Sequence, residues 1–596
     1  MKLPFKLFIF FFRLWLLSIK TILYYIRTTW LTNADVEDGQ KSVFLRAGFA
    51  PVTKEHDLVP VKLENSLPDD FPAGQYIRNG PNAQYIHGNG SDYHWFDGDG
   101  MLHGVFYPKD SPSTLYYSNK WVRTLHWKEE RQADRALHTR LADITHCGES
   151  FVLMLLRQIG RKIGLLPSLE GRSVANTSVV HHSRKLMALV EADLPTIVVA
   201  PELSTKGPFN FSGKLNTSFT AHPKIDQHSG ELIAFGYGFQ SAPFCTYYVV
   251  SPQGELTTSH PIHLDVPVMM HDFGITENYS ILLDFPITFR IERVLKGQAP
   301  IAFEHTHPAR IGVIARRPNN EQPVWFRVES GFIFHVGNAW ERTAANGQDV
   351  EIVMIACHMK HMSSALFASA DNQPRFTNPE AANAAAKPYL RQYVLNLRTH
   401  QVKEKVLCTE FSCEFPIIPP ALQGRPSRYV YCSTVAAGKP DFCNIDDENE
   451  PILFDGVMKY DVEKGEIVAH HQWDDNVFGG EVVFVPSLDQ QQVDGSEEDF
   501  GFLLTFTTNE KLQTSAFQVL SAKTLEPIVE VPTPSRVPYG FHGTWMSMED
   551  IENQVYVSNF QQLIQEASSS GSSSSSRSNL NNENVGSSDS NDNLNE

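Results

Sequence analysis

The sequence has little of what several common classes of protein require. Only 7 of its 596 residues are cysteine, spaced irregularly and without a CxxC pair. This spacing indicates neither a disulfide framework nor a thiolate metal site, and favours a reducing compartment. The formal net charge is −18, whereas nucleic-acid binding requires a basic surface. No HExxH motif occurs, which argues against a zinc protease. No regular repeat of the WD or kelch type occurs either, so the sequence pattern alone does not identify a propeller.

The N-terminus departs from this acidic average. Residues 1–30 contain five cations and no acidic residue. Four of the cations, Lys6, Arg13, Lys20 and Arg27, recur every seven residues and would line one face of a helix. In a bilayer-spanning helix, Arg13 and Lys20 would each cost about 2.5–3.5 kcal/mol. We therefore expect an amphipathic helix in the membrane plane; the alternative is a cleaved targeting segment or signal anchor. Such a segment is compatible with a plastid, an endoplasmic reticulum or a plasma-membrane address.

Most of the remaining chain has the pattern of β-strands. Residues 245–264, 389–407 and 456–473 each consist of two β-rich runs around a polar turn, as in Pro252-Gln253-Gly254, and predict hairpins. The main helical candidate is residues 378–390. Many short hairpins must hide their edges, which favours a closed or radial all-β architecture.

Composition also predicts the boundaries of the domain. Residues 31–44 read as a linker and residues 45–564 as the β-rich domain. Residues 565–596 are rich in Ser and Asn and cannot bury a core, so we expect a disordered tail. Residues 489–499 are acidic and polar and predict a long hairpin loop.

Four of the 23 histidines stand out by their surroundings. Each lies at the end of an apolar or β-rich run: "FTAHPKID" (His222), "VMMHDFGIT" (His271), "FIFHVGNAWE" (His335) and "YGFHGTWM" (His542). The last is flanked by glycines, which allow the backbone to approach another segment closely. An inward-pointing imidazole in such a place is either a packed core residue or a metal ligand. The spacing does not show whether the four meet.

The order of short motifs is more specific. The stretches "YIRNGPNAQY", "YHWFDGDGMLHGV", "LMALVEADLP", "CEFPIIPP", "GGEVVFVP" and "RVPYGFHGTW", together with the four histidine contexts, resemble the carotenoid cleavage dioxygenase family. The resemblance extends from about residue 45 to about residue 560, which is most of the chain.

This resemblance implies a seven-bladed β-propeller with loops and helices capping an axial Fe²⁺. The iron ligands of the family match His222, His271, His335 and His542. Three carboxylates behind them match Glu191, Glu414 and Glu481, and by position would hold His271, His335 and His542. Such hydrogen bonds fix the ring direction and raise ligand basicity. In this arrangement the carboxylates bind the histidines and not the metal, which distinguishes it from the two-His-one-carboxylate triad of other non-haem iron enzymes.

The implied reaction is the cleavage of a carotenoid or apocarotenoid double bond by O₂ into two carbonyl products, without an organic cofactor. Four protein ligands would leave two adjacent positions open on an octahedral ion. The long apolar substrate requires an apolar, aromatic-lined tunnel, which the 38 phenylalanines could supply. Because such a substrate resides in membranes, an N-terminal membrane helix fits the same function.

Three alternatives stay open at this point. Stilbene-cleaving relatives have a lysine before the glutamate that matches Glu191, whereas this chain has Val190, which disfavours a phenolic stilbene. A retinoid or carotenoid isomerase on the same scaffold is not excluded by the sequence. An iron-free propeller that serves as a binding module would have no reason to keep all seven matching residues.

Overall fold

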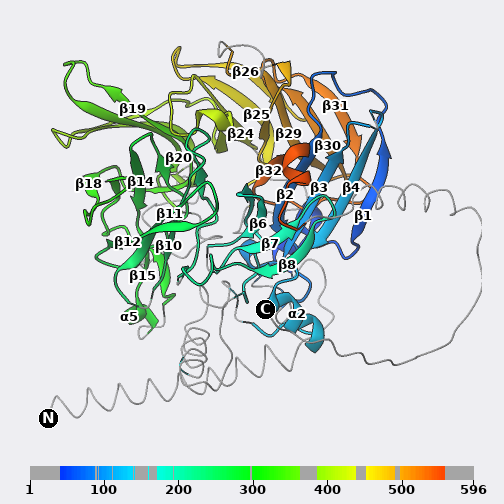
Figure 1. The fold of residues 1–596 in the computed structure, drawn as a ribbon, viewed down its shortest axis with the longest axis horizontal. Helices are drawn as coiled ribbons and strands as arrows, with labels where there is room; N and C mark the ends of the chain where they lie inside the picture. Colours follow the sequence, from blue (N-terminus) through cyan, green and yellow to red (C-terminus); the bar gives the residue numbers. More distant parts are fainter. Residues whose placement is uncertain are drawn as a thin grey trace, which may run out of the picture. The chain divides into compact units, whose positions relative to one another are not determined.

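In the computed structural model, the chain folds into a mostly β structure of seven blades (Figure 1). The structure describes residues 41–556, with gaps at 87–89, 91–92, 111, 139, 141–158, 160–170, 192, 216, 240, 295–297, 363–384, 438–450 and 490–496. Seven sheets have four or five strands each, and one further sheet is a two-stranded ribbon. The expected seven-bladed propeller is therefore confirmed.

The first blade joins the two ends of the described chain. Its order is β1 (His56–Lys62), β4 (Thr114–Trp121), β3 (Gly100–Tyr107), β2 (Gly74–Pro81) and β32 (Gly543–Ser547). The last strand pairs antiparallel with β2, so that Arg78 lies opposite Gly543 and Gly74 opposite Ser547. This pairing closes the ring between strands that are far apart in sequence and removes a sheet edge.

The other six blades follow in chain order. The second blade is β5 (Ser178–His182), β6 (Lys185–Leu189), β7 (Thr196–Val199) and β8 (Ser204–Pro208); the third is β9 (Lys224–Ile225), β10 (Leu232–Tyr237), β11 (Phe244–Val250) and β12 (Leu256–His263). The fourth is β13 (Gly274–Ile275), β14 (Tyr279–Asp284), β17 (Arg310–Ala315) and β18 (Val324–Arg327), next in sequence to the ribbon β15 (Ile287–Phe289) and β16 (Ile301–Phe303). The fifth is β19 (Phe332–Thr343), β20 (Val350–Met359), β21 (Tyr389–Asn396) and β22 (Val402–Val406); the sixth is β23 (Cys413–Ile417), β24 (Tyr429–Val435), β25 (Phe454–Asp461) and β26 (Glu466–Gln472). The seventh contains β27 (Val477–Phe478), β28 (Val483–Pro486), β29 (Gly501–Asn509), β30 (Thr514–Ser521) and β31 (Pro527–Pro532).

Helices are few and short in the described part of the chain. They are η2 (Val43–Leu45), η3 (Ala47–Phe49), η4 (Trp95–Asp97), α2 (Leu125–Ala133), α5 (Ile291–Val294), η5 (Pro420–Leu422) and α7 (Met548–Glu552). None of the described helices has both the length and the apolar character needed to cross a bilayer. The expected N-terminal helix, residues 31–40 of the linker expected at 31–44, and the C-terminal tail lie outside the described residues, as does most of the helical candidate at 378–390.

The three hairpins expected from the sequence are present. They are the pairs β11–β12, β21–β22 and β25–β26. Gly254 and Gly465 occupy the turns of two of them with φ of +83° and +75°, a conformation that glycine adopts without steric cost. Turn chemistry and strand propensity in the sequence were therefore sufficient to place these pairs.

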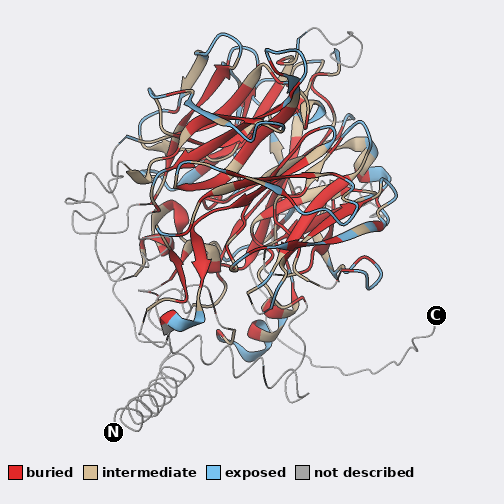
Figure 2. Cartoon of the chain, turned by 90° about the vertical axis from the view of Figure 1, so that its left-hand side faces the viewer, coloured by how far each residue is buried: buried red, intermediate tan, exposed pale blue. Residues whose placement is uncertain are grey.

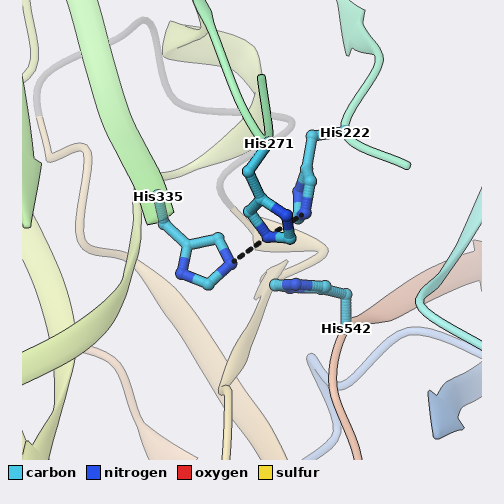
Figure 3. A group of neighbouring side chains, drawn as sticks. All are labelled: His222, His271, His335 and His542. Carbon is cyan, nitrogen blue, oxygen red and sulfur yellow. Dashed lines mark hydrogen bonds between the residues drawn. The ribbon is translucent and has the colours of Figure 1, made fainter. Parts of the chain in front are cut away.

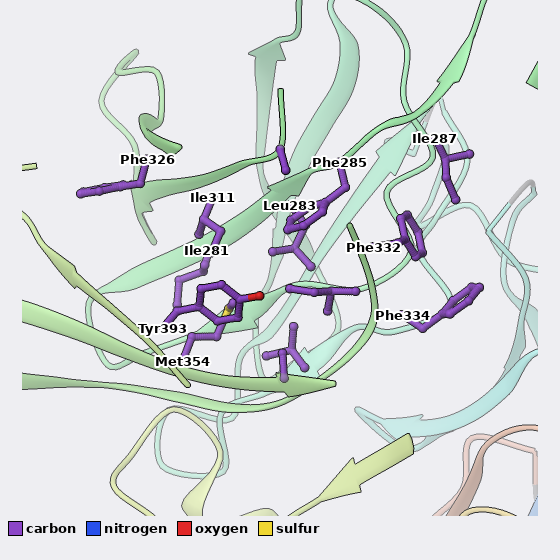
Figure 4. Packing of buried hydrophobic residues seen from close by; sticks show 14 of the residues in the cluster. Ile281, Leu283, Phe285, Ile287, Ile311, Phe326, Phe332, Phe334, Met354 and Tyr393 are labelled. Carbon is purple, nitrogen blue, oxygen red and sulfur yellow. The ribbon is translucent and has the colours of Figure 1, made fainter. Parts of the chain in front are cut away.

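The strands are largely buried (Figure 2), and apolar layers between the sheets hold the blades together. One layer joins the fourth and fifth blades and contains Ile281, Ile311, Phe332, Met354 and Tyr393 (Figure 4). Each of these five side chains is no more than 1% exposed. At about 25 cal/mol per Å² of buried apolar surface, such layers supply the main stabilisation of the blades.

Candidate metal centre

Four histidines from four different blades meet in the interior (Figure 3). They are His222, His271, His335 and His542, and one ring nitrogen from each lies within 4.8 Å of the others. His222, His271 and His542 lie shortly before β9, β13 and β32, and His335 lies within β19. Each of these strands forms one edge of its blade. The residues that the sequence left far apart are thus brought together by the radial arrangement of the blades.

The glycines around His542 allow a close approach of two segments. A Cβ on Gly540 would lie 2.8 Å from the Asn79 carbonyl oxygen, and a Cβ on Gly80 would lie 2.7 Å from the Cα of Gly540. The Asn79 amide donates to the His542 carbonyl at 3.0 Å. Any larger side chain at these glycines would push the His542 segment away from β2.

A local irregularity aims His335 inward. The pairing of β19 with β20 shifts register on both sides of Val336, which is the signature of a β-bulge. A similar irregularity follows Glu414 in β23, where Phe415 has a φ of +52°. Bulges of this kind re-aim side chains locally, so simple in-and-out alternation does not predict the direction of either residue.

Each of three carboxylates accepts a hydrogen bond from the outer nitrogen of one histidine. Glu191 Oε1 pairs with His271 Nδ1, Glu414 Oε2 with His335 Nδ1 at 2.5 Å, and Glu481 Oε1 with His542 Nδ1 at 2.8 Å. A proton on Nδ1 leaves the Nε2 lone pair free and directed at the other rings. The three acids therefore fix both the tautomer and the orientation of their histidines.

The carboxylates are themselves held by further donors. Glu481 Oε2 accepts the Gly543 amide at 2.8 Å, and Glu414 Oε2 accepts the Phe415 amide at 2.6 Å. Glu191 Oε2 accepts the hydroxyl of Tyr237, on β10, at 2.5 Å. Tyr237 was not identified from the sequence, because its partner is 46 residues away and no local pattern connects the two.

Asp272 links three of the histidine-bearing segments. It directly follows His271, accepts the Val336 amide through Oδ2 at 2.7 Å, and receives Lys224 Nζ on Oδ1 at 2.8 Å. Val336 directly follows His335, and Lys224 lies two residues after His222. The sequence analysis did not identify these contacts of Asp272. The one local signal was an acidic residue inside the otherwise apolar run "VMMHDFG".

The charge balance of this cluster favours a cation. His271 Nε2 lies 3.1 Å from His222 Nε2 and 3.3 Å from His335 Nε2 (Figure 3). Burial, together with the neighbouring rings, lowers the pKa of His222 and His335 well below the usual value. Burial acts in the same direction on His271, but the Glu191 carboxylate outweighs it and raises that pKa. Ring nitrogens that converge in this way, with carboxylates behind three of the rings, are suited to a divalent transition-metal ion.

Burial also affects one carboxylate behind the histidines. It raises the pKa of Glu414 to about 8, against the opposing effect of the Phe415 amide. A divalent cation bound by the four rings would favour the ionised carboxylate, because a bound ion is the largest local charge in such a site. The donor set thus fits a metal ion, with neutral ligands in front and anionic groups behind.

A second buried group of potential ligands is less suited to a cation. Asp99, His126 and Glu130 each offer an atom within 4.8 Å of the others. However, Arg140 lies 2.9 Å from Glu130 Oε2, and the Leu137 amide donates to Glu130 Oε1 at 2.8 Å. A guanidinium already neutralises this carboxylate, so we assign the group a structural role.

Aromatic side chains surround the four histidines. The Phe334 ring lies 5.1 Å from that of His271, and the Phe415 ring lies 5.1 Å from His335 and 5.3 Å from His542. Phe541 precedes His542 and packs 4.6 Å from Trp95. The rings thus provide an apolar surface next to the converging nitrogens.

Comparison with known proteins gives a consistent result. Residues 49–547 match the family described as retinal pigment epithelial membrane protein. Carotenoid 9,10(9',10')-cleavage dioxygenase 1 of Phaseolus vulgaris is 33% identical over 521 residues, covering 86% of this chain and 90% of that protein. A chloroplastic 9-cis-epoxycarotenoid dioxygenase of Arabidopsis thaliana is 30% identical over 522 residues, covering 86% of this chain and 83% of its own length.

Solved structures agree in fold. Cobalt-substituted Synechocystis ACO superposes with a TM-score of 0.66 at 25% identity, covering 84% of this chain and 98% of that one. The lignostilbene dioxygenase of Pseudomonas brassicacearum gives a TM-score of 0.69 at 23% identity, covering 85% and 98%; at this identity it shows the fold alone. With a match over most of its length, this chain belongs to the retinal pigment epithelial membrane protein family, the family of the carotenoid cleavage dioxygenases.

Proposed function

We propose that the protein is a non-haem Fe²⁺ dioxygenase that cleaves one C=C bond of a carotenoid or apocarotenoid with O₂. The observation that carries this proposal is the convergence of four imidazoles from remote parts of the chain, three of them backed by carboxylates. The relatives named for carotenoid cleavage support the substrate class.

In this proposal each polar residue has a defined task. His222, His271, His335 and His542 would hold Fe²⁺, and the iron would supply the O₂ chemistry. Glu191, Glu414 and Glu481 keep the Nδ1 protons of three rings and so direct Nε2 toward the ion. Asp272 limits movement of the backbone next to His335 by accepting the Val336 amide. Tyr237 limits movement of Glu191 by donating its hydroxyl to that carboxylate.

The apolar residues bind and position the polyene. Phe334, Phe415 and Phe541 present ring surfaces at or next to the histidines. A conjugated hydrocarbon has no hydrogen-bonding group along its chain, so shape and apolar contact must select which bond lies beside the centre. The same rings exclude water from the reacting carbons.

The proposed reaction balances without any further reductant. Both atoms of one O₂ enter the products: the C=C bond breaks, and each of its two carbons becomes a carbonyl carbon. No proton has to be supplied or removed overall. This agrees with a centre whose nearest protein groups are ligands and their supports, with no separate acid–base pair among the residues described there.

The direct test uses the iron-loaded protein with β-carotene, zeaxanthin and an apocarotenal under ¹⁸O₂. We expect paired carbonyl products, each with one heavy oxygen, and about one iron per chain. Cleavage of a phenolic stilbene in preference to these substrates would support the stilbene alternative, which Val190 disfavours. A geometric isomer without added oxygen would support the isomerase. Absence of stoichiometric iron would support a binding scaffold.

We further propose that residues 1–30 attach the protein to the membrane that contains the substrate. The support is the seven-residue spacing of Lys6, Arg13, Lys20 and Arg27 between apolar runs, which suits a helix in the membrane plane. Deletion of residues 1–30 should release the protein from anionic vesicles while activity on detergent-dispersed substrate stays within about twofold. A truncated protein that still sediments with vesicles would contradict this role.

A further inference from the structure

Three cysteines form a third compact group of potential ligands. Cys357 on β20, Cys413 on β23 and Cys432 on β24 have sulfur atoms that lie within 4.8 Å of one another. All three side chains are 0% exposed. Their irregular spacing in the sequence gave no indication of a thiolate site, since the three strands belong to two different blades.

The group lies in the apolar layer between the fifth and sixth blades. Its surroundings include Ile355, Leu390, Val430 and Met458, all 0% exposed. The next residue after Cys413 is Glu414, which pairs with His335. Cys413 therefore packs in this apolar layer, whereas the carboxylate of the next residue reaches the histidine centre.

The spacing of the sulfurs suits a soft cation. A metal–sulfur bond of about 2.3 Å places three sulfurs around a central ion about 4 Å apart, within the observed limit of 4.8 Å. Thiolates select soft ions such as Zn²⁺ or Cu⁺, whereas Mg²⁺ and Ca²⁺ require oxygen ligands. The group of three as identified contains sulfur donors alone, which excludes the hard ions.

The charge balance favours a divalent ion over a monovalent one. Thiolate is the form of cysteine that binds a metal, so binding releases the thiol protons. Three thiolates around a divalent cation leave a net charge of −1. Three thiolates around Cu⁺ would leave a charge of −2 in an apolar layer.

We propose that Cys357, Cys413 and Cys432 form a binding site for a soft divalent cation of the Zn²⁺ class, separate from the four-histidine centre. The ion would join β20 of the fifth blade to β23 and β24 of the sixth. By binding Cys413, the ion would also hold in place the strand β23, which carries Glu414. The established family activity does not require this site, so its loss should alter stability more than catalysis.

The test begins with the full-length, iron-loaded protein purified under reducing conditions. Metal analysis should find zinc near one equivalent per chain in addition to iron, or none until it is added. On addition of Cd²⁺, we expect thiolate-to-cadmium charge-transfer absorption that saturates at one equivalent, with release of thiol protons when the site starts empty. Iron should stay bound, because the histidine centre offers Cd²⁺ no sulfur ligand.

Two variants distinguish this group from other thiols. Cys432→Ala should lose the charge-transfer absorption, whereas Cys245→Ala, which removes another buried thiol on β11, should keep it. Loss of iron on addition of Cd²⁺, equal absorption in Cys432→Ala, or no absorption in the wild type would each overturn the proposal. If Cys432→Ala fails to fold, a wild type without this absorption would still overturn the proposal.

Bound metal should also stabilise the fold. The midpoint of thermal unfolding should rise on saturation with Zn²⁺ in the wild type and in Cys245→Ala, since an ion that binds only the folded state adds to its stability. The rise should be absent in Cys432→Ala. An equal rise in all three proteins would assign the effect to ions elsewhere and contradict the cysteine site.

Discussion

The four-histidine centre and the apolar layer between the fourth and fifth blades are both buried, but different interactions position their side chains. In the layer, Ile281, Ile311 and Met354 pack by area and shape with neighbours from regular strands. In the centre, His335 is positioned by a bulge and by a single carboxylate. One strand, β19, serves both, because Phe332 enters the layer and His335 enters the centre. The geometry of the centre thus depends on particular hydrogen-bonded atoms, whereas the layer depends on how completely side chains fill its volume.

The largest effect should follow removal of one imidazole. His335→Ala should lower iron content and cleavage activity by more than about 100-fold, beyond the 10–100-fold typical for partners of a ligand. Metal analysis and product formation measure both. The free energy of unfolding should fall by no more than about 1–2 kcal/mol relative to the metal-free wild type, the size of one lost hydrogen bond.

His400→Ala serves as the control for this substitution, because His400 is exposed in the turn after β21. It should keep iron and activity. If His335→Ala retained a full equivalent of iron with wild-type turnover, the assignment of this ligand would be wrong. If the His335→Ala protein were unfolded, the centre would contribute to stability as the apolar layer does, contrary to our expectation.

The next largest effect should follow a change in a supporting carboxylate. Glu414→Gln keeps the shape of the side chain but removes the negative charge that holds His335 Nδ1. We expect a 10- to 100-fold loss in iron affinity or activity, measured by iron titration against a chelator and by turnover at saturating iron. Glu404→Gln, a change on the outer strand β22, is the matched control and should leave both quantities unchanged.

A smaller effect should follow loss of the tie between segments. Asp272→Asn should weaken the contact with Lys224 while keeping the acceptor for the Val336 amide. The Lys224 side chain is only 12% exposed, so an unpaired charge there costs more than a lost surface pair, and the three segments should move apart slightly. We expect about a tenfold loss of iron affinity, with partial recovery in the double variant Asp272→Asn, Lys224→Met. Equal losses in the single and double variants would assign Asp272 a role that is independent of Lys224.

The comparison also explains how much could be read from the sequence. The hairpins around Gly254 and Gly465 follow from local turn chemistry, and the four histidines follow from motifs next to them. Tyr237, Asp272 and the cluster at Cys432 could not be predicted in this way. Their partners come from other blades, and the contacts depend on how the sheets pack around the ring. Bulges add to this limit, because they interrupt the two-residue alternation from which strand faces are predicted.

The smallest effect on iron binding should follow a substitution in the apolar layer between the fourth and fifth blades. Met354→Ala removes a fully buried side chain among Ile281, Ile311 and Tyr393 and should lower the free energy of unfolding by about 2–5 kcal/mol. Iron content and turnover per folded molecule should stay within about twofold, because no atom of Met354 belongs to the hydrogen-bond network of the histidines. Urea unfolding and turnover at low temperature measure the two quantities separately. Met354→Leu, which nearly conserves volume, should recover most of the stability. A Met354→Ala protein with normal stability but no iron would contradict this independence of the layer and the centre. It would show that packing in the layer sets the geometry of the four histidines.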